Sequence, residues 1–278
     1  MTYNTENLAP LIDPVCDIAL RAGEEIMEVY RSHKPDIKYK ADKSPVTRAD
    51  LAADQLIRKE LKQLTPEWPI LSEEHTKGLD FETRSAWSTY WLVDPLDGTK
   101  GFIKQNGFFT VNIALIDNHQ PVLGVIFAPS DEHLYYARRG GGAYKQIKNE
   151  LAQKISVRKI PRNKPVVVAS RAHINKPTQM LIDALDAEEI RVDSSLKCCM
   201  VADGSADLYL RSGPTSEWDT GAGQCIVEEA GGQLTDCSGS PLEYNHKESY
   251  LNPSFVVHCP ASPPWKKYVE ELLKKTPV

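Results

Sequence analysis

Acidic residues occur in three short segments that could together hold a metal ion. The segments are Ser72-Glu73-Glu74, residues 94–99 (Asp-Pro-Leu-Asp-Gly-Thr) and Trp218-Asp219. Each lies where a strand is expected to end or a helix to begin. A hard divalent cation such as Mg²⁺ takes oxygen ligands, usually a few carboxylates completed by water and phosphate oxygens. We therefore expect these carboxylates to form a magnesium centre.

The central segment supplies several of the expected ligands. Asp94 at the end of a strand, the carbonyl of Leu96 and the carboxylate of Asp97 can converge on one cation, because Pro95 restricts the backbone between them. An EF-hand loop is excluded, since the twelfth position counted from Asp94 is Gln105 and not glutamate.

A phosphate site is expected directly after these ligands. Gly98 and Thr99 form a turn into a helix that should begin near Lys100, and the free N–H groups and dipole of its first turn would hold a phosphate. Taken singly, each piece is weak, because an Asp-Gly pair is usually only a turn and adjacent glutamates are usually a solvated face. The order and spacing of the three segments together make the signal specific.

The elements that must position these residues are short and mixed. Apolar spacing predicts helices over residues 11–30 and 49–64, and Thr47 with Asp50 three residues later forms a capping-box-like start to the second. Strands are predicted over residues 70–72, 90–93, 110–116, 122–127, 134–137, 165–169, 206–210 and 255–258. Helices are predicted over residues 178–185, 196–202, 220–230 and 264–275.

This pattern indicates an α+β protein. The strands and helices do not alternate strictly, so layered mixed α and β is favoured over a Rossmann sheet. Residues 34–47 are expected to be a loop or an edge hairpin. The glycine-rich residues 138–142 lack the Gly-Lys-Ser/Thr of a phosphate loop, so a tight turn between strands is expected there.

Composition excludes several classes of protein. The 278 residues are 41% apolar and 26% charged, which is typical of a folded globular enzyme. The net charge of −5 argues against nucleic-acid binding, which needs a broad basic surface. The six cysteines form no C-x-x-C pair, so we expect reduced thiols. Without a signal-like N-terminus or an apolar run of about 20 residues, a cytoplasmic protein is expected.

Nearly the whole chain resembles the lithium-sensitive, Mg²⁺-dependent phosphatase superfamily of inositol monophosphatase, fructose-1,6-bisphosphatase and the bisphosphate nucleotidases. Within it, the likeness to bacterial 3'(2'),5'-bisphosphate nucleotidases is closest. The segments that carry the likeness are residues 44–47 (SPVT), 90–100 (YWLVDPLDGTK), 102–104 (FIK), 106–107 (NG), 110–115 (TVNIAL), 194–197 (SSLK), 213–215 (GPT) and 218–220 (WDT). The resemblance implies a layered α-β-α-β-α sandwich, with a single phosphatase domain of two packed halves, about residues 1–150 for the metals and about 151–278 for the substrate.

The resemblance also implies individual roles. Metal ligands for two or three Mg²⁺ ions are implied at Glu73, Asp94, Leu96, Asp97 and Asp219. Catalytic roles are implied for Asp50, Glu73 and Thr99, with Asp50 and Thr99 holding the water that attacks the phosphate. Substitution of Asp50 by Asn or of Glu73 by Gln should then abolish turnover while the fold is retained.

On the substrate side, the resemblance implies contacts to an adenosine bisphosphate. The implied residues are Gly98, Thr99, Ser170, His173, Ser194, Ser195, Lys197 and Asp219. For His173 an exposed loop position, and for Lys197 a solvated helix face, remain the alternatives. Three positions depart from the family pattern: Asp193 stands where a glycine is common, and Gly101 and Phe108 each stand where an acidic residue is usual. A carboxylate at Asp193 would repel phosphate unless it is turned away.

Three functions remain open from the sequence. The first is hydrolysis of adenosine 3',5'-bisphosphate in sulfur metabolism, with a small phosphorylated nucleotide as the only expected partner. The second is an inositol or sugar phosphatase, which would not need Lys197. The third is a non-catalytic Mg²⁺ or nucleotide sensor on the same fold. Either a monomer or a homodimer is compatible with the sequence, and the basic amphipathic segment 264–275 leaves room for peripheral membrane association.

Overall fold

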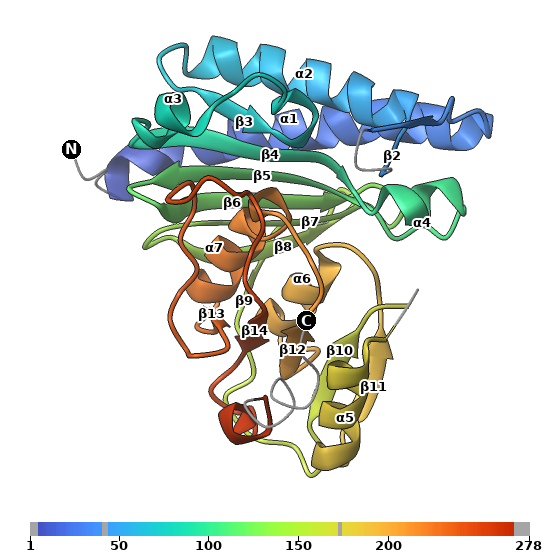
Figure 1. Cartoon of the computed structure of the whole chain (residues 1–278), viewed down its shortest axis with the longest axis vertical. Coiled ribbons are helices and arrows are strands. Elements are labelled where there is room, and N and C mark those ends of the chain that lie inside the picture. The colour runs from blue at the N-terminus through green and yellow to red at the C-terminus, as the bar shows by residue number, and fades with distance from the viewer. Residues whose placement is uncertain (1–4, 41–43, 172–173, 270–278) are drawn as a thin grey trace.

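Two β-sheets and three layers of helices alternate through the molecule, in the order helix, sheet, helix, sheet, helix (Figure 1). The computed structural model describes residues 5–40, 44–171 and 174–269. The expected α+β class and the layered α-β-α-β-α arrangement are confirmed.

The first helical layer is formed by α1 (Thr5–Ser32) and α2 (Arg48–Leu64). The predicted capping box is present at α2: the Thr47 side chain accepts from Ala49 N–H, and the Asp50 carboxylate accepts from Thr47 N–H. The first helix begins six residues before its predicted start and includes Pro10 and Pro14. Its apolar stripe explains the extension, because Leu8 is fully buried one turn before Ile12.

The large sheet has seven strands in chain order, with only the first pair parallel. The strands are β3 (Ile70–Ser72), β4 (Thr89–Asp97), β5 (Thr110–Asp117), β6 (Gln120–Ala128), β7 (His133–Arg138), β8 (Gly142–Ile147) and β9 (Gln153–Ile155). The predicted hairpin of β5 and β6 is confirmed, and residues 138–142 form the predicted turn between strands. A short hairpin of β1 (Lys38–Tyr39) and β2 (Pro45–Val46) precedes the sheet.

The small sheet completes the sandwich, with strand order β11-β10-β12-β14-β13. Its strands are β10 (Val166–Ala169), β11 (Glu188–Arg191), β12 (Leu208–Arg211), β13 (Gln233–Asp236) and β14 (Phe255–His258). Helices α6 (Leu196–Ala202) and α7 (Gly221–Glu229) lie between the two sheets, and α5 (Lys176–Leu185) covers the outer face of the small one (Figure 1).

Glycine allows α7 to approach the large sheet closely. A Cβ at Gly124 of β6 would lie 2.5 Å from the backbone oxygen of Ala222, and one at Gly221 would lie 3.0 Å from Leu92. Real carbon atoms do not approach within 2.5 Å, so Gly124 requires the absence of a side chain, and a Cβ at Gly221 would force the Leu92 side chain to shift. The close contact brings the residues just before α7, including Asp219, beside β4.

Two further expectations concern the whole chain. All six cysteines are free, as expected for reduced thiols. Within the described ranges, no helix is both long and apolar enough to cross a membrane. Of the predicted helix over residues 264–275, residues 265–269 are helical and residues 270–275 lie outside the described residues.

Candidate metal centre and substrate pocket

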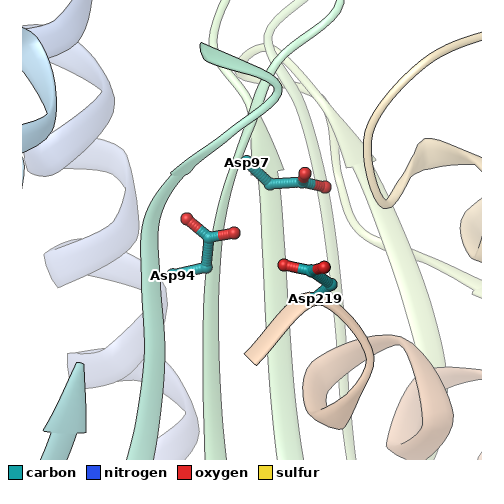
Figure 2. A group of neighbouring side chains, drawn as sticks. All are labelled: Asp94, Asp97 and Asp219. Carbon is teal, nitrogen blue, oxygen red and sulfur yellow. The ribbon is translucent and has the colours of Figure 1, made fainter. Parts of the chain in front are cut away.

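Three carboxylates from distant parts of the chain meet between the large sheet and α7. Oxygen atoms of Asp94, Asp97 and Asp219 all lie within 4.8 Å of one another, and Figure 2 shows the three side chains converging on one space. Asp94 and Asp97 come from the end of β4, and Asp219 ends the short 3₁₀ helix η2 (Glu217–Asp219). Three of the predicted metal ligands are therefore brought together.

A bulge in β4 allows two aspartates three residues apart to face the same space. Asp94 pairs with Asn112, but Asp97 pairs with Thr110, so three steps on β4 oppose two steps on β5. In a regular strand, residues three apart point to opposite faces. The sequence predicted that the strand ends at Asp94, but it continues through the bulge to Asp97.

The electrostatics of this cluster favour a cation. Loss of hydration, followed by repulsion from Glu73, raises the pKa of Asp94 well above its usual value. Loss of hydration and the charge of Asp97 likewise raise the pKa of Asp219 to about 8. Carboxylates with such raised pKa values keep their protons until a bound cation replaces them. The donors are all oxygen atoms, so the residues present fit a hard divalent cation.

Glu73, the fourth predicted carboxylate ligand, lines a cleft together with Asp94, Asp97 and Asp219. Its carboxylate is paired with a lysine. Glu73 begins the 3₁₀ helix η1 (Glu73–His75). Lys40 donates to Glu73 at 2.7 Å and to Glu74 at 2.8 Å. Burial raises the pKa of Glu74 to about 7. Lys40 therefore supplies the positive charge beside Glu73 in this structure.

A buried aspartate that the sequence did not single out fixes the position of η1. Asp54 of α2 accepts a hydrogen bond from Ser72 Oγ at 2.5 Å and lies 2.8 Å from His75 Nδ1. His75 Nε2 in turn lies 2.7 Å from the guanidinium of Arg58. Residues on both sides of Glu73 and Glu74 are thus attached to α2. Asp54 is 1% exposed, and its spacing of three and seven residues from the apolar Ile57 and Leu61 on one helix face was the available signal.

Asp50 and Thr99, the predicted pair for the attacking water, are in contact. The Thr99 hydroxyl lies 3.0 Å from Asp50 Oδ1 and 3.3 Å from the carbonyl oxygen of Leu96. The other carboxylate oxygen of Asp50 accepts from the Thr47 N–H and hydroxyl. Burial raises the pKa of Asp50, which these hydrogen bonds partly oppose. Thr99 begins the predicted helix, α4 (Thr99–Ile103), directly after Gly98, whose φ is 95°.

Ser195 lines a pocket beside the metal centre, and its hydroxyl points toward the centre. Its hydroxyl lies 2.8 Å from Asp97 Oδ2 and 3.0 Å from the carbonyl oxygen of Asp219, and it accepts from Asn112 Nδ2 at 2.8 Å. The serine is 4% exposed. These contacts orient Asp97, a role that the sequence did not predict for either Ser195 or Asn112.

Thr99 lines the cleft that holds Glu73 and Asp94. Six other predicted substrate residues line a pocket beside the centre: Gly98, Ser170, Ser194, Ser195, Lys197 and Asp219. This pocket has a volume of about 320 Å³ and adjoins a cleft of about 420 Å³ that contains Glu73 and Asp94; Asp97, Gly98 and Asp219 line both. Four basic residues line the pocket: Lys100, Lys104, Lys197 and Arg211. Only Lys197 was predicted. The sequence could have indicated Lys100 and Lys104, which follow Thr99 on the same short helix.

Lys197 is buried in the wall of this pocket. Its Nζ donates to the carbonyl of Ser194 at 2.7 Å and lies 5.5 Å from the ring centre of Tyr209. Loss of hydration lowers its pKa. The solvated helix face considered as the alternative for Lys197 is therefore wrong. The Ser194 hydroxyl is buried and has no hydrogen-bond partner among the described residues.

Ser170 and the unusual Asp193 lie at the same pocket. Ser170 Oγ donates to Asp193 Oδ1 at 2.8 Å, and both residues line the pocket wall. His173 lies outside the described residues.

Comparison with known proteins agrees with this geometry. Residues 7–276 match the model of the inositol monophosphatase family. The 3'(2'),5'-bisphosphate nucleotidase CysQ of Escherichia coli (strain K12) is 47% identical over 249 residues, which cover 89% of this chain and 99% of that protein. The protein of the same name from Buchnera aphidicola is 41% identical over 251 residues, covering 89% of this chain and 93% of its own.

A solved structure shares the fold. The crystal structure of CysQ from Bacteroides thetaiotaomicron, described as a bacterial member of the inositol monophosphatase family, has a TM-score of 0.79 and 39% identity, and the match covers 94% of this chain and 100% of that one. With the family model matched over almost the entire chain, this protein belongs to the inositol monophosphatase family.

Proposed function

We propose that this protein is a Mg²⁺-dependent phosphatase that hydrolyses adenosine 3',5'-bisphosphate to AMP and phosphate. One observation supports the proposal most: a cluster of three carboxylates lies at the junction of a cleft and a pocket lined by four basic side chains. A substrate with two phosphates could place one phosphate at the carboxylate cluster and the other in the basic pocket. The name that the E. coli and Buchnera relatives carry, 3'(2'),5'-bisphosphate nucleotidase, supports the same substrate class.

In this proposal two or three Mg²⁺ ions are bound by Glu73, Asp94, the Leu96 carbonyl, Asp97 and Asp219. Bound Mg²⁺ supplies Lewis acidity, which neutralises phosphate charge and makes water a better nucleophile. Lys40 must release Glu73 when that carboxylate becomes a ligand. Asp219 Oδ2 accepts from Ser216 N–H at 2.9 Å, and this capping interaction fixes the orientation of the carboxylate.

Asp50 and Thr99 then handle the proton of the attacking water. The Thr99 hydroxyl donates to Asp50 Oδ1, so its lone pairs are free to accept a hydrogen bond from that water. The proton passes to Thr99 Oγ1 as the hydroxyl proton passes to Asp50 Oδ1. A carboxylate whose pKa is raised by burial is a better proton acceptor at neutral pH, which suits Asp50 to this role.

The second phosphate and the nucleoside occupy the basic pocket. Lys100 and Lys104 come from α4 and its C-cap, Lys197 comes from α6, and Arg211 comes from β12. We place the remaining predicted contacts, at Gly98, Ser170, His173, Ser194 and Ser195, around the same ligand. Ser195 acts there through Asp97, which its hydroxyl orients.

Two competing functions differ from this one in a measurable way. An inositol or sugar monophosphatase would not use four basic residues for a substrate with one phosphate, and a non-catalytic sensor would not need the Asp50–Thr99 pair. We further propose that the enzyme is cytoplasmic and inhibited by lithium, and that it acts as a monomer or homodimer. In this proposal each chain consists of two packed halves, about residues 1–150 and 151–278.

Phosphate release from a panel of substrates tests the proposal. Adenosine 3',5'-bisphosphate, inositol 1-phosphate and fructose 1,6-bisphosphate are each supplied with Mg²⁺ or with EDTA. The proposal predicts the highest kcat/KM for the adenosine bisphosphate and no release in EDTA. Comparable rates on inositol 1-phosphate would favour the second function, and no release from any substrate would favour the sensor.

A further inference from the structure

Asp193 connects the two opposite walls of the substrate pocket. On the small-sheet side, its Oδ1 accepts from the Ser170 hydroxyl at 2.8 Å and from the backbone N–H of Arg171 at 3.0 Å. On the large-sheet side, its Oδ2 accepts from Asn106 Nδ2 at 3.4 Å. Asn106 lies in the turn that follows α4, which carries Lys100. One carboxylate therefore holds both walls of the cavity that faces the metal centre.

A second contact joins the same two walls. The Arg171 guanidinium lies over the ring of Phe108, with its Cζ 4.6 Å from the ring centre. Phe108 in turn donates its backbone N–H to Asn106 Oδ1 at 2.9 Å. A cation over an aromatic face contributes modestly, about 0.5–1 kcal/mol at an exposed site. The two contacts together make a clasp of Asp193, Ser170, Arg171, Asn106 and Phe108.

Gly101 gives this clasp the space it needs. A Cβ at Gly101 would lie 2.8 Å from Asn106 Oδ1 and 3.0 Å from the carbonyl oxygen of Phe108. Any side chain there would therefore displace the Asn106 side chain, which donates to Asp193, or the Phe108 carbonyl. Gly101, Phe108 and Asp193 are thus in one contact network.

The charge of Asp193 fits a positioning role better than a ligand-contact role. A free carboxylate in a pocket for phosphates would repel them, but this one accepts from three donors on two walls. Removal of the Asp193 carboxylate would leave the Ser170 hydroxyl and the Arg171 amide without their acceptor, and would separate the pocket walls. The carboxylates of the metal centre receive no hydrogen bond from Ser170, Arg171 or Asn106 in the described part of the chain.

We propose that Asp193 is a positioning residue that determines specificity: by clasping the Ser170-Arg171 segment to Asn106, it sets the width of the pocket for the nucleoside part of the substrate. This inference rests on the proposed function, because it assumes that a nucleotide fills the pocket. Asp193 contributes to nucleotide binding, and the chemistry at the metal centre does not depend on it.

Inhibition by the two products, AMP and inorganic phosphate, distinguishes an effect on nucleotide binding from an effect on the metal centre. For Asp193→Ala, we expect the KM for adenosine 3',5'-bisphosphate and the inhibition constant of AMP to rise about tenfold or more, equivalent to about 1.4 kcal/mol. The inhibition constant of inorganic phosphate and kcat should stay within about twofold, since phosphate alone binds at the metals. Asp193→Asn, which keeps one acceptor oxygen, should give an intermediate KM.

A matched control and two contrary outcomes complete the test. Asp186→Asn removes an exposed carboxylate of the same half, which is paired only with Lys164 in the described structure, and should change none of these constants. Equal increases in the constants for AMP and phosphate would overturn the inference, because they would indicate general distortion. A fall in kcat without a change in KM would also overturn it.

Hydrogen exchange tests the clasp without any substrate. The Arg171 amide donates to Asp193 in the wild type, so its exchange should accelerate about tenfold or more in Asp193→Ala and remain unchanged in Asp186→Asn. Unchanged exchange in Asp193→Ala would exclude the clasp. Failure of the proposed function would instead appear in the wild type, as weak hydrolysis of the adenosine bisphosphate, while the exchange result would still hold.

Discussion

Asp50 uses its two carboxylate oxygens for different purposes. Oδ2 accepts from Thr47 and caps α2, whereas Oδ1 accepts from Thr99 at the edge of the metal centre. The cap fixes the side chain before any substrate binds, so the oxygen that faces Thr99 is already in place. One residue thereby couples the start of a helix to the site of proton transfer.

Loss of this carboxylate should cost activity far more than stability. Asp50→Asn weakens the helix cap by about 1 kcal/mol, which lowers Tm by a few degrees. It also removes the proton acceptor, so kcat should fall about a hundredfold or more. Asp80→Asn, at the cap of α3 (Phe81–Ser85), is the control for loss of a capping carboxylate and should keep full kcat. More than a few per cent of wild-type turnover in Asp50→Asn would refute the assigned role.

The metal centre should make stability depend on pH in a characteristic direction. The pKa values of Asp94, Asp219 (about 8) and Glu74 (about 7) are raised by burial in the absence of metal. Between their usual values and these raised values, the folded state binds more protons than the unfolded state, so their contribution to stability falls as pH rises. Mg²⁺ replaces those protons, so it should stabilise the protein more at high pH.

Thermal unfolding checks this expectation. The rise in Tm that Mg²⁺ causes over EDTA should be larger at about pH 8 than at about pH 6. Asp219→Asn should reduce the effect, since it removes one of the titrating ligands. An equal rise in Tm at the two pH values would contradict the proposed exchange of protons for metal.

At the scale of the helices and strands, the close packing of α7 against the large sheet determines the position of Asp219 beside β4. Gly124→Ala should push α7 outward, because the new methyl would lie 2.5 Å from the Ala222 carbonyl oxygen. We expect a loss of about 1–3 kcal/mol in the free energy of unfolding, together with weaker Mg²⁺ activation. In Gly213→Ala the methyl would meet only the Arg211 side chain at 3.7 Å, so stability should change little. Denaturant unfolding and Mg²⁺ titration measure both effects.

The sequence predicted elements wherever burial produced a regular pattern. The helices α1, α2, α5, α6 and α7 and the central strands were found from their apolar spacing. The strands β11 and β13 were missed because β11 is an exposed edge strand of sequence EEIR, and β13 is a short strand that begins with an exposed residue. Side-chain periodicity is weak in such strands.

The site was only partly predictable for a related reason. Asp94, Asp97 and Asp219 could be selected by residue type and motif, but the bulge that turns Asp97 toward Asp94 depends on pairing with β5. Ser195 was predicted to contact the substrate, and the structure places its hydroxyl against Asp97. Contacts between residues far apart in sequence, such as Asn112 with Ser195, leave no local pattern.

At the scale of the molecule, a buried arginine joins an early helix to a late loop. Arg84 of α3 is 1% exposed and donates to Asn245 Oδ1 and to the carbonyls of Lys247 and Glu248. Asn245 donates its backbone N–H to Glu217, which begins η2. The arginine therefore supports the segment that ends in Asp219.

Replacing this arginine should destabilise the protein and weaken the metal centre together. In Arg84→Met, several buried acceptors lose their donor, so we expect a loss of about 3–5 kcal/mol in the free energy of unfolding. Activity should need more Mg²⁺, because η2 is less constrained. Arg162→Met, at an exposed site, is the control for loss of a positive charge. Wild-type stability in Arg84→Met would show that the network is dispensable.

The identity of the first product formed from adenosine 3',5'-bisphosphate tests the central claim most directly. The substrate is incubated with the enzyme and Mg²⁺, and the products are identified by phosphorus NMR. With one phosphate at the carboxylate cluster and the other in the basic pocket, we predict inorganic phosphate and adenosine 5'-monophosphate, with no reaction in EDTA. Formation of adenosine 3'-monophosphate, or no hydrolysis under conditions in which inositol 1-phosphate is consumed, would contradict the claim.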